Sequence, residues 1–164
     1  MFNFTSIADV TAGLKTFADL NGIPSKQICL GGGAALLLMG ARQETADLNV
    51  WVDEVHFKRL CEEFKVTNHP MTDTVVQIKV TPPNGYILEG QTFEVWVRER
   101  NYYFKHVEAA DGLNIFDPLT LSIHKHGGLI EPKRPKTKRD QDRKDIRFLN
   151  EILAEKNKVR DIAA

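Results

Sequence analysis

Apolar residues recur at helical spacing near both ends of the chain. The first set predicts an amphipathic helix over residues 5–21, with Thr5 or Ser6 as its cap and Asn21-Gly22 at its end. The second set predicts a closing helix over residues 139–157. The apolar positions are Ile7, Val10, Leu14 and Phe17 in the first helix, and Ile146, Leu149, Ile152 and Leu153 in the last.

Between these helices the hydrophobic pattern changes every few residues, which indicates shorter elements. Alternating or continuous apolar runs predict strands over 28–30, 47–52, 74–80, 86–88, 92–97 and 102–107. Helices are predicted over 34–40, over 53–64 and from Asp117, as a cap before Pro118, to Gly127-Gly128. This order predicts an α+β fold, in which a mixed β-sheet is flanked by helices and followed by C-terminal helices.

Two finer expectations concern packing. The last four predicted strands, with a turn at 82–85, are expected to form an antiparallel meander. In the helix over 53–64, Val55, Leu60 and Phe64 are expected to face inward.

Length and composition fit one domain. The chain has 164 residues, of which 42% are hydrophobic, so residues 1–164 can form a single domain with a core at about 22–110 and a helical part at about 117–160. Cys29 and Cys61 stand apart in apolar settings and are expected to be reduced. The N-terminus lacks signal-peptide features, and the run Ala34 to Met39 is too short to span a bilayer. We therefore expect a cytoplasmic protein without a membrane partner.

The formal net charge is zero, but the charges are unevenly distributed. Residues 133–139, KRPKTKR, contain five basic residues and no acidic one, so a polyanion would meet the protein there. This segment is either a contact for RNA or a protein partner, or a solvated loop. Asp142 and Asp145, which follow it, are expected to form ion pairs on the helix surface with Lys138, Arg139 or Lys144.

Three glycines, Gly31, Gly32 and Gly33, separate a predicted strand from a predicted helix. Their spacing matches neither the dinucleotide-binding nor the Walker fingerprint, so by themselves they predict a tight turn. The residues after the turn change the interpretation. Gly40-x-Arg42-x-x-Thr45 is followed by Asp47-Leu48-Asn49, which opens the next strand.

This succession resembles the nucleotidyltransferase superfamily of DNA polymerase beta, and most closely its bacterial abortive-infection type. The resemblance spans about residues 28–153 and includes the segments 117–125 and 139–149. It implies that Gly31, Gly32, Gly33, Arg42 and Thr45 lie at the phosphates of a nucleoside triphosphate (NTP), and that Lys125 offsets their charge. It also implies that Asp47, the residue at position 49 and Glu94 hold Mg²⁺ or Mn²⁺ for transfer of a nucleotide to an RNA or protein acceptor. Two acids at i and i+2 of a strand face the same side and can reach one hard cation.

Asn49 departs from the resemblance, because the family has aspartate at this position. Three hypotheses follow. Either Asp47 and Glu94 are sufficient ligands for a weakened metal site, or Asp53 or Glu44 supplies the carboxylate that is missing at position 49. In the third hypothesis the site is catalytically degenerate. A degenerate protein would bind a nucleotide, RNA or protein in a toxin–antitoxin, phage-defence or counter-defence setting. A small α+β interaction module with an accidental resemblance is the remaining alternative. For single residues, the alternatives are that Glu94 and Lys125 are solvated and that Arg42 pairs with a nearby carboxylate.

Overall fold

The computed structural model describes residues 2–63, 66–68, 78–80, 86–88, 91–98 and 106–163. The predicted turn at 82–85, Phe64 and the predicted strand residues 74–77 and 102–105 lie outside these ranges. The chain divides into two compact units, Met1–Phe116 and Asp117–Ala164, so the boundary falls where the helical part was expected to begin.

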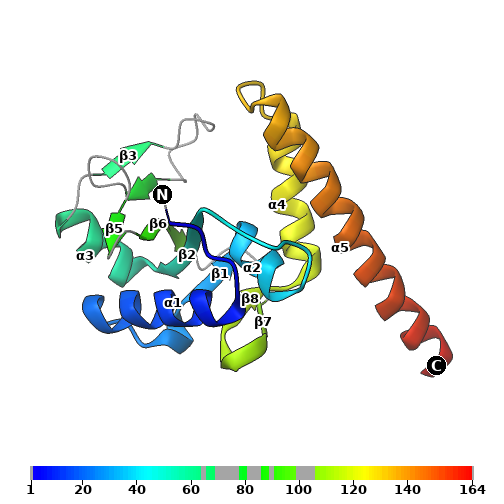
Figure 1. Cartoon of the computed structure of the whole chain (residues 1–164), viewed down its shortest axis with the longest axis horizontal. Coiled ribbons are helices and arrows are strands. Elements are labelled where there is room, and N and C mark those ends of the chain that lie inside the picture. Colours follow the sequence, from blue (N-terminus) through cyan, green and yellow to red (C-terminus); the bar gives the residue numbers. More distant parts are fainter. Residues whose placement is uncertain are drawn as a thin grey trace. The chain divides into compact units, whose positions relative to one another are not determined.

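The first unit contains one mixed β-sheet with helices, which confirms the α+β class (Figure 1). Its strands run in the order β3-β4-β6-β2-β1-β8-β7, and β5 pairs with β6. Their bounds are β1 Cys29–Gly31, β2 Asp47–Asp53, β3 Val66–Asn68, β4 Ile78–Val80, β5 Tyr86–Leu88, β6 Gln91–Arg98, β7 His106–Glu108 and β8 Asn114–Phe116. At the centre, β1 is antiparallel to β2, whereas β2 is parallel to β6.

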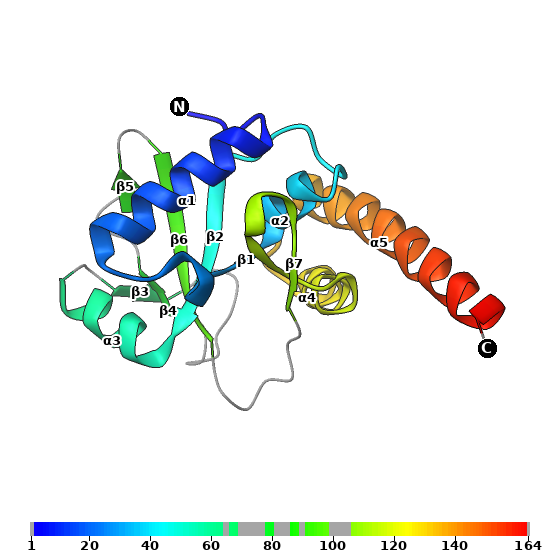
Figure 2. The same cartoon turned by 90° about the horizontal axis from the view of Figure 1, so that it is seen from below.

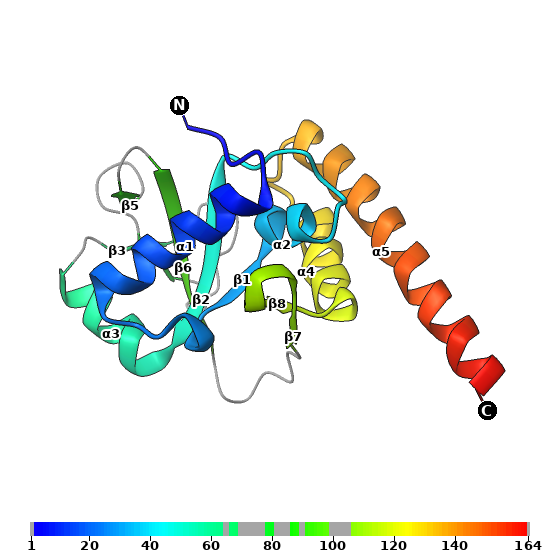
Figure 3. The same ribbon diagram turned by 60° about the horizontal axis from the view of Figure 1, so that its bottom comes forward.

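One face of the sheet is buried under the helices α1 (Ile7–Asn21) and α3 (Glu54–Glu63). Figures 2 and 3 both show α1 lying across β2 and β6, with α3 on the same side. Leu48, Val50 and Val52 of β2 are fully buried, and Phe17 of α1 stacks on Phe93 of β6 with ring centroids 5.0 Å apart. Alternation along β2 therefore turns Asp47, Asn49, Trp51 and Asp53 to the opposite face.

Local signals predicted most elements of the first unit, but two packing expectations were wrong. The strands do not form a simple meander, because β7 pairs with β8 at the other edge of the sheet. Val55 does not face inward: it is 71% exposed, and Phe57 is buried beside Leu60 instead. The remaining elements are α2 (Gly32–Leu38) and the 3₁₀ turns η1 (Ser25–Gln27) and η2 (Ala110–Gly112).

The second unit is a hairpin of two helices, α4 (Pro118–Ile130) and α5 (Lys136–Ala163), which lie side by side in Figure 1. Asp117 caps α4 as expected, because its Oδ1 accepts a hydrogen bond of 2.8 Å from the Thr120 N–H. The helix α5 begins three residues earlier and ends later than the sequence pattern predicted. Among the described helices, none combines the length and apolar character required to cross a bilayer.

Candidate functional site

Three residues of the predicted site lie in one row across the sheet. Gly31 of β1 is opposite Asn49 of β2, and Asn49 is opposite Glu94 of β6. Asp47 lies two residues before Asn49 on β2 and therefore faces the same side. Strands in a sheet are about 4.8 Å apart, so this row brings together side chains that are distant in the sequence.

The glycines of the turn allow the side chains of this site to pack against the backbone. Gly32 has a left-handed backbone with φ of 55°, and a Cβ atom there would collide with the amide Nδ2 of Asn49. A Cβ atom on Gly33 would lie 2.6 Å from Thr45 Oγ1 and 2.8 Å from Arg42 Nη1. The turn thus brings Arg42, Thr45 and Asn49 close to consecutive glycines.

The segment before β2 is held by the N-terminus of the chain. Phe4 and Thr45 exchange backbone hydrogen bonds of 2.9 and 3.0 Å, and the Phe4 side chain is fully buried. The Thr45 hydroxyl donates a 3.1 Å hydrogen bond to the carbonyl of Asp47. These contacts give Thr45 a positioning role next to Asp47, in addition to its predicted place at a phosphate.

The Asn49 side chain carries an unusual feature: its Oδ1 atom is buried and accepts no hydrogen bond from the described residues. A buried acceptor without a donor is costly, at about 1–3 kcal/mol. A cation is one partner that would satisfy it, because carboxylate and amide oxygens suit Mg²⁺ or Mn²⁺. The oxygen donors of Asp47, Asn49 and Glu94 are of the chemical type that such an ion prefers. They carry two negative charges, whereas a site with aspartate at position 49 would carry three. Across the described ranges, no three histidine, cysteine, aspartate or glutamate side chains form a metal-binding group.

Sequence reasoning missed the aromatic residues beside this row. Trp51 and Trp96 stack with centroids 5.4 Å apart and planes 13° from parallel, and Phe116 meets Trp51 edge-on at 5.2 Å. Alternation could have identified the pair, since Trp51 follows Asn49 by two residues and Trp96 follows Glu94 by two. The two tryptophans form the next cross-strand pair on the sheet face that carries Asn49 and Glu94.

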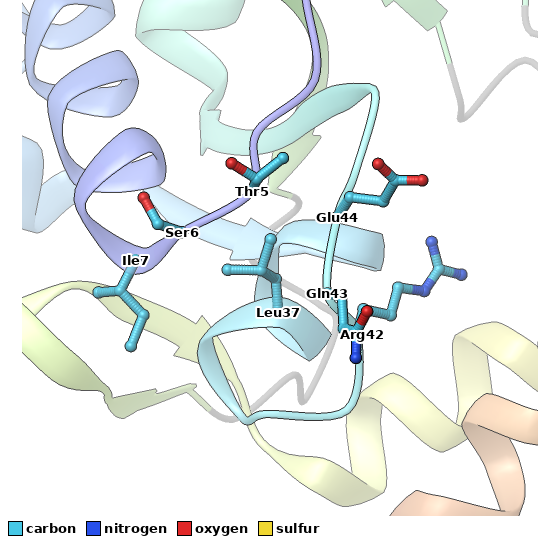
Figure 4. Close-up of a pocket in the computed structure, with 7 residues that line it drawn as sticks. All are labelled: Thr5, Ser6, Ile7, Leu37, Arg42, Gln43 and Glu44. Atoms are coloured by element: carbon cyan, nitrogen blue, oxygen red, sulfur yellow. The ribbon is translucent and has the colours of Figure 1, made fainter.

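A surface hollow lies next to the Arg42 segment (Figure 4). Figure 4 shows Thr5, Ser6 and Ile7 on one side and Arg42, Gln43 and Glu44 on the other, with Leu37 between them. The opposite charges of Arg42 and Glu44 are both at this rim. Glu44, one of the two possible substitute acids, is held by a 3.4 Å hydrogen bond from Asn3.

Lys125 lies in the helical unit and forms ion pairs across the hairpin. Its Nζ atom is 3.0 Å from Asp145 Oδ2 and 3.3 Å from Asp142 Oδ1. Arg134 also binds Asp142, through Nε at 2.5 Å and Nη2 at 2.9 Å. The expectation of surface ion pairs for Asp142 and Asp145 was therefore wrong, since both side chains are buried. Their partners include Lys125, Arg134 and Gln141.

His124 precedes Lys125 and is also mostly buried. Burial and the positive charge of Lys125 lower the pKa of His124 to about 4. The imidazole is accordingly neutral near pH 7. This part of α4 therefore combines a neutral histidine with a lysine that is neutralised by two aspartates.

A comparison with protein-family models and one with curated proteins give no match to this chain. The nucleotidyltransferase hypothesis consequently depends on the residues and geometry described above.

Proposed function

We propose that the sheet face carrying Asp47, Asn49 and Glu94 binds a divalent metal and a nucleoside triphosphate, as in a nucleotidyltransferase. The observation that carries the proposal is the buried Oδ1 of Asn49, which lacks a donor among the described residues and lies in register with Glu94. An amide oxygen that no hydrogen bond from the described residues satisfies, next to a carboxylate on the neighbouring strand, supports the proposal because Mg²⁺ prefers such oxygen ligands.

In this proposal each residue has a separate role. Asp47, Glu94 and the Asn49 amide would hold Mg²⁺ or Mn²⁺, which would neutralise charge on the phosphates. Arg42 and the backbone of Gly31 to Gly33 would position the triphosphate. An acceptor hydroxyl on RNA or protein would bond to the α-phosphorus, pyrophosphate would leave with the broken P–O bond, and the hydroxyl proton would pass to solvent.

Lys125 needs a more specific role than the one first expected. Its ammonium group already pairs with Asp142 and Asp145, so its net contribution toward a triphosphate is smaller than that of an unpaired lysine. We assign it first to the stability of the helical hairpin, and charge compensation for the triphosphate remains a separate prediction.

Asn49 also supports a second candidate, a catalytically degenerate binding protein. Replacing a carboxylate with an amide removes one of the charges that attract the metal, which weakens metal binding while the fold is kept. Such a protein would capture a nucleotide, RNA or protein partner in a toxin–antitoxin, phage-defence or counter-defence setting.

Metal and nucleotide titrations test the first candidate. Because both tryptophans of the chain neighbour the site, Mn²⁺ with an NTP is expected to change their fluorescence. Asp47→Asn and Glu94→Gln are expected to weaken binding about tenfold or more, and Asn49→Asp to strengthen it. Asp19→Asn, an exposed change on α1, is the control. Equal binding by all variants would reject the metal site.

Transfer assays then separate enzyme from binding protein. Labelled NTPs with a pool of RNA and protein acceptors should give labelled product only with Asp47 intact if the protein is an enzyme. Binding without transfer, together with transfer by Asn49→Asp, would establish the degenerate alternative.

A further inference from the structure

The basic segment 133–139 divides into two groups of side chains. The arginines point to the hairpin itself: Arg134 binds Asp142, and Arg139 Nη2 donates a 2.6 Å hydrogen bond to the Glu131 carbonyl. The lysines at 133, 136 and 138 are exposed. The arginines thus fix the connection between α4 and α5, and the lysines remain at the surface.

The exposed lysines continue into a larger positive surface on the first half of α5. Between residues 132 and 147 there is one exposed acid, Asp140, which binds Arg143 at 2.8 Å. Asp142 and Asp145 do not reduce the surface charge, because both are buried against Lys125. The exposed cations, which we term the basic surface, are Lys133, Lys136, Lys138, Arg143, Lys144 and Arg147.

We propose that the basic surface binds the phosphate backbone of a nucleic acid. From Lys136 to Arg147 the helix rises about 16 Å, so its cations can meet several successive phosphates. Binding would be electrostatic and insensitive to base sequence, because backbone contacts carry no sequence information.

The composition of the surface favours nucleic acid over the two other anionic partners. Protein interfaces have an apolar or aromatic centre, and interfacial membrane helices need an apolar face. Among residues 132–147, all exposed side chains except Pro132 and Pro135 are polar or charged. The apolar residue Ile146 is buried.

This inference is independent of nucleotidyl transfer. The basic surface belongs entirely to the second unit, whereas the proposed metal site belongs to the first. Binding measured without metal or NTP therefore tests the surface alone, and its failure would leave the metal site untouched.

The experiment uses the full-length protein and fluorescein-labelled RNA, single-stranded or duplex, over a range of salt concentrations. With about five phosphate contacts, the slope of log K against log salt is expected to be about −3.5 for single strands. The double variant Lys136→Glu/Lys144→Glu should bind at least about tenfold more weakly, with a slope for single strands that is smaller by about 1.4.

The matched control is Lys156→Glu/Lys158→Glu, which changes two exposed lysines farther along the same helix and gives the same net charge. It should bind nearly like the unaltered protein, and circular dichroism (CD) should show unchanged helicity for both variants. Equal weakening by both pairs would overturn the proposal, because only net charge would then matter. Binding to phosphatidylserine vesicles or to an acidic polypeptide, but not to RNA, would overturn it as well.

Discussion

Lys125 and Asp145 form an ion pair of 3.0 Å between the two helices of the second unit, with side chains that are 11% and 1% exposed. The lysine of α4 and the aspartates of α5 therefore depend on each other. Lys125 is thus both the lysine that the resemblance suggested as catalytic and the lysine that forms a buried ion pair in the structure. Stability must consequently be measured before any activity of a Lys125 variant is interpreted.

Removing Lys125 should destabilise the helical hairpin. Lys125→Ala removes the ammonium group that pairs with both buried carboxylates, and the expected loss is about 3 kcal/mol in the free energy of unfolding. Urea unfolding followed by CD measures it, with Lys156→Ala, which changes an exposed lysine of α5, as the control. A loss of less than about 1 kcal/mol would mean that the ion pair is worth no more than a surface pair.

His124 should make the stability depend on pH. Its folded pKa of about 4 lies below the unfolded value of 6.5, so the unfolded chain binds the proton first as pH falls. Its contribution is complete above pH 6.5 and is lost progressively down to about pH 4, by up to about 3 kcal/mol. His124→Gln should show a flatter stability profile in this window, although carboxylates still titrate in both proteins. Parallel profiles would contradict the assigned pKa.

Alanine substitutions at the two adjacent glycines of α4 should have opposite effects on the stability of the protein. A Cβ atom on Gly127 meets nothing within 4 Å, so Gly127→Ala should stabilise the helix by about 0.5–1 kcal/mol. A Cβ atom on Gly128 would lie 3.0 Å from both Arg134 Nε and Asp142 Oδ2, so Gly128→Ala should lose this gain or destabilise the protein. Urea unfolding of both variants provides the comparison, and equal stabilisation would show that the ion pair does not pack against Gly128.

Comparing alanine variants of Gly22 and Gly32 separates the cost of backbone strain from the cost of a steric collision. Both have left-handed backbones, with φ of 55° and 63°, but a Cβ atom meets nothing at Gly22 and meets Asn49 at Gly32. Gly22→Ala should cost about 1 kcal/mol, and Gly32→Ala clearly more. Adding Asn49→Ala to Gly32→Ala should recover part of the difference, which a double-mutant cycle measures. Equal costs for the two glycines would place the Asn49 amide away from the turn.

Local chemistry was sufficient to predict most of the elements, although not the strands β3 and β8, and it did not predict the contacts between elements. The Ser6 and Asp117 caps and the glycine end of α1 are encoded within a few residues, and the structure contains all three. The partners of Asp142 could not be predicted in the same way, because helix spacing suggested neighbours on α5 while the true partners lie on α4 and the loop. Likewise, the pairing of β7 with β8, and of Asn49 with Glu94, depends on strand register, which local alternation does not determine.

The stacked tryptophans should give a spectroscopic signal specific to the first unit. Trp51 and Trp96 are the two tryptophans of the chain, and their near-parallel indoles should couple to give an exciton pair of bands in far-ultraviolet CD. Trp51→Phe and Trp96→Phe should each abolish this signal completely, since one indole cannot couple alone. Phenylalanine keeps an aromatic ring at either position, so the stability loss should stay near 1 kcal/mol. If either single variant retains the coupled bands, the rings are not stacked as described. Once the exciton bands are assigned to the two tryptophans, they report the unfolding of the sheet. The unfolding of the helical hairpin is then followed separately by the total helicity.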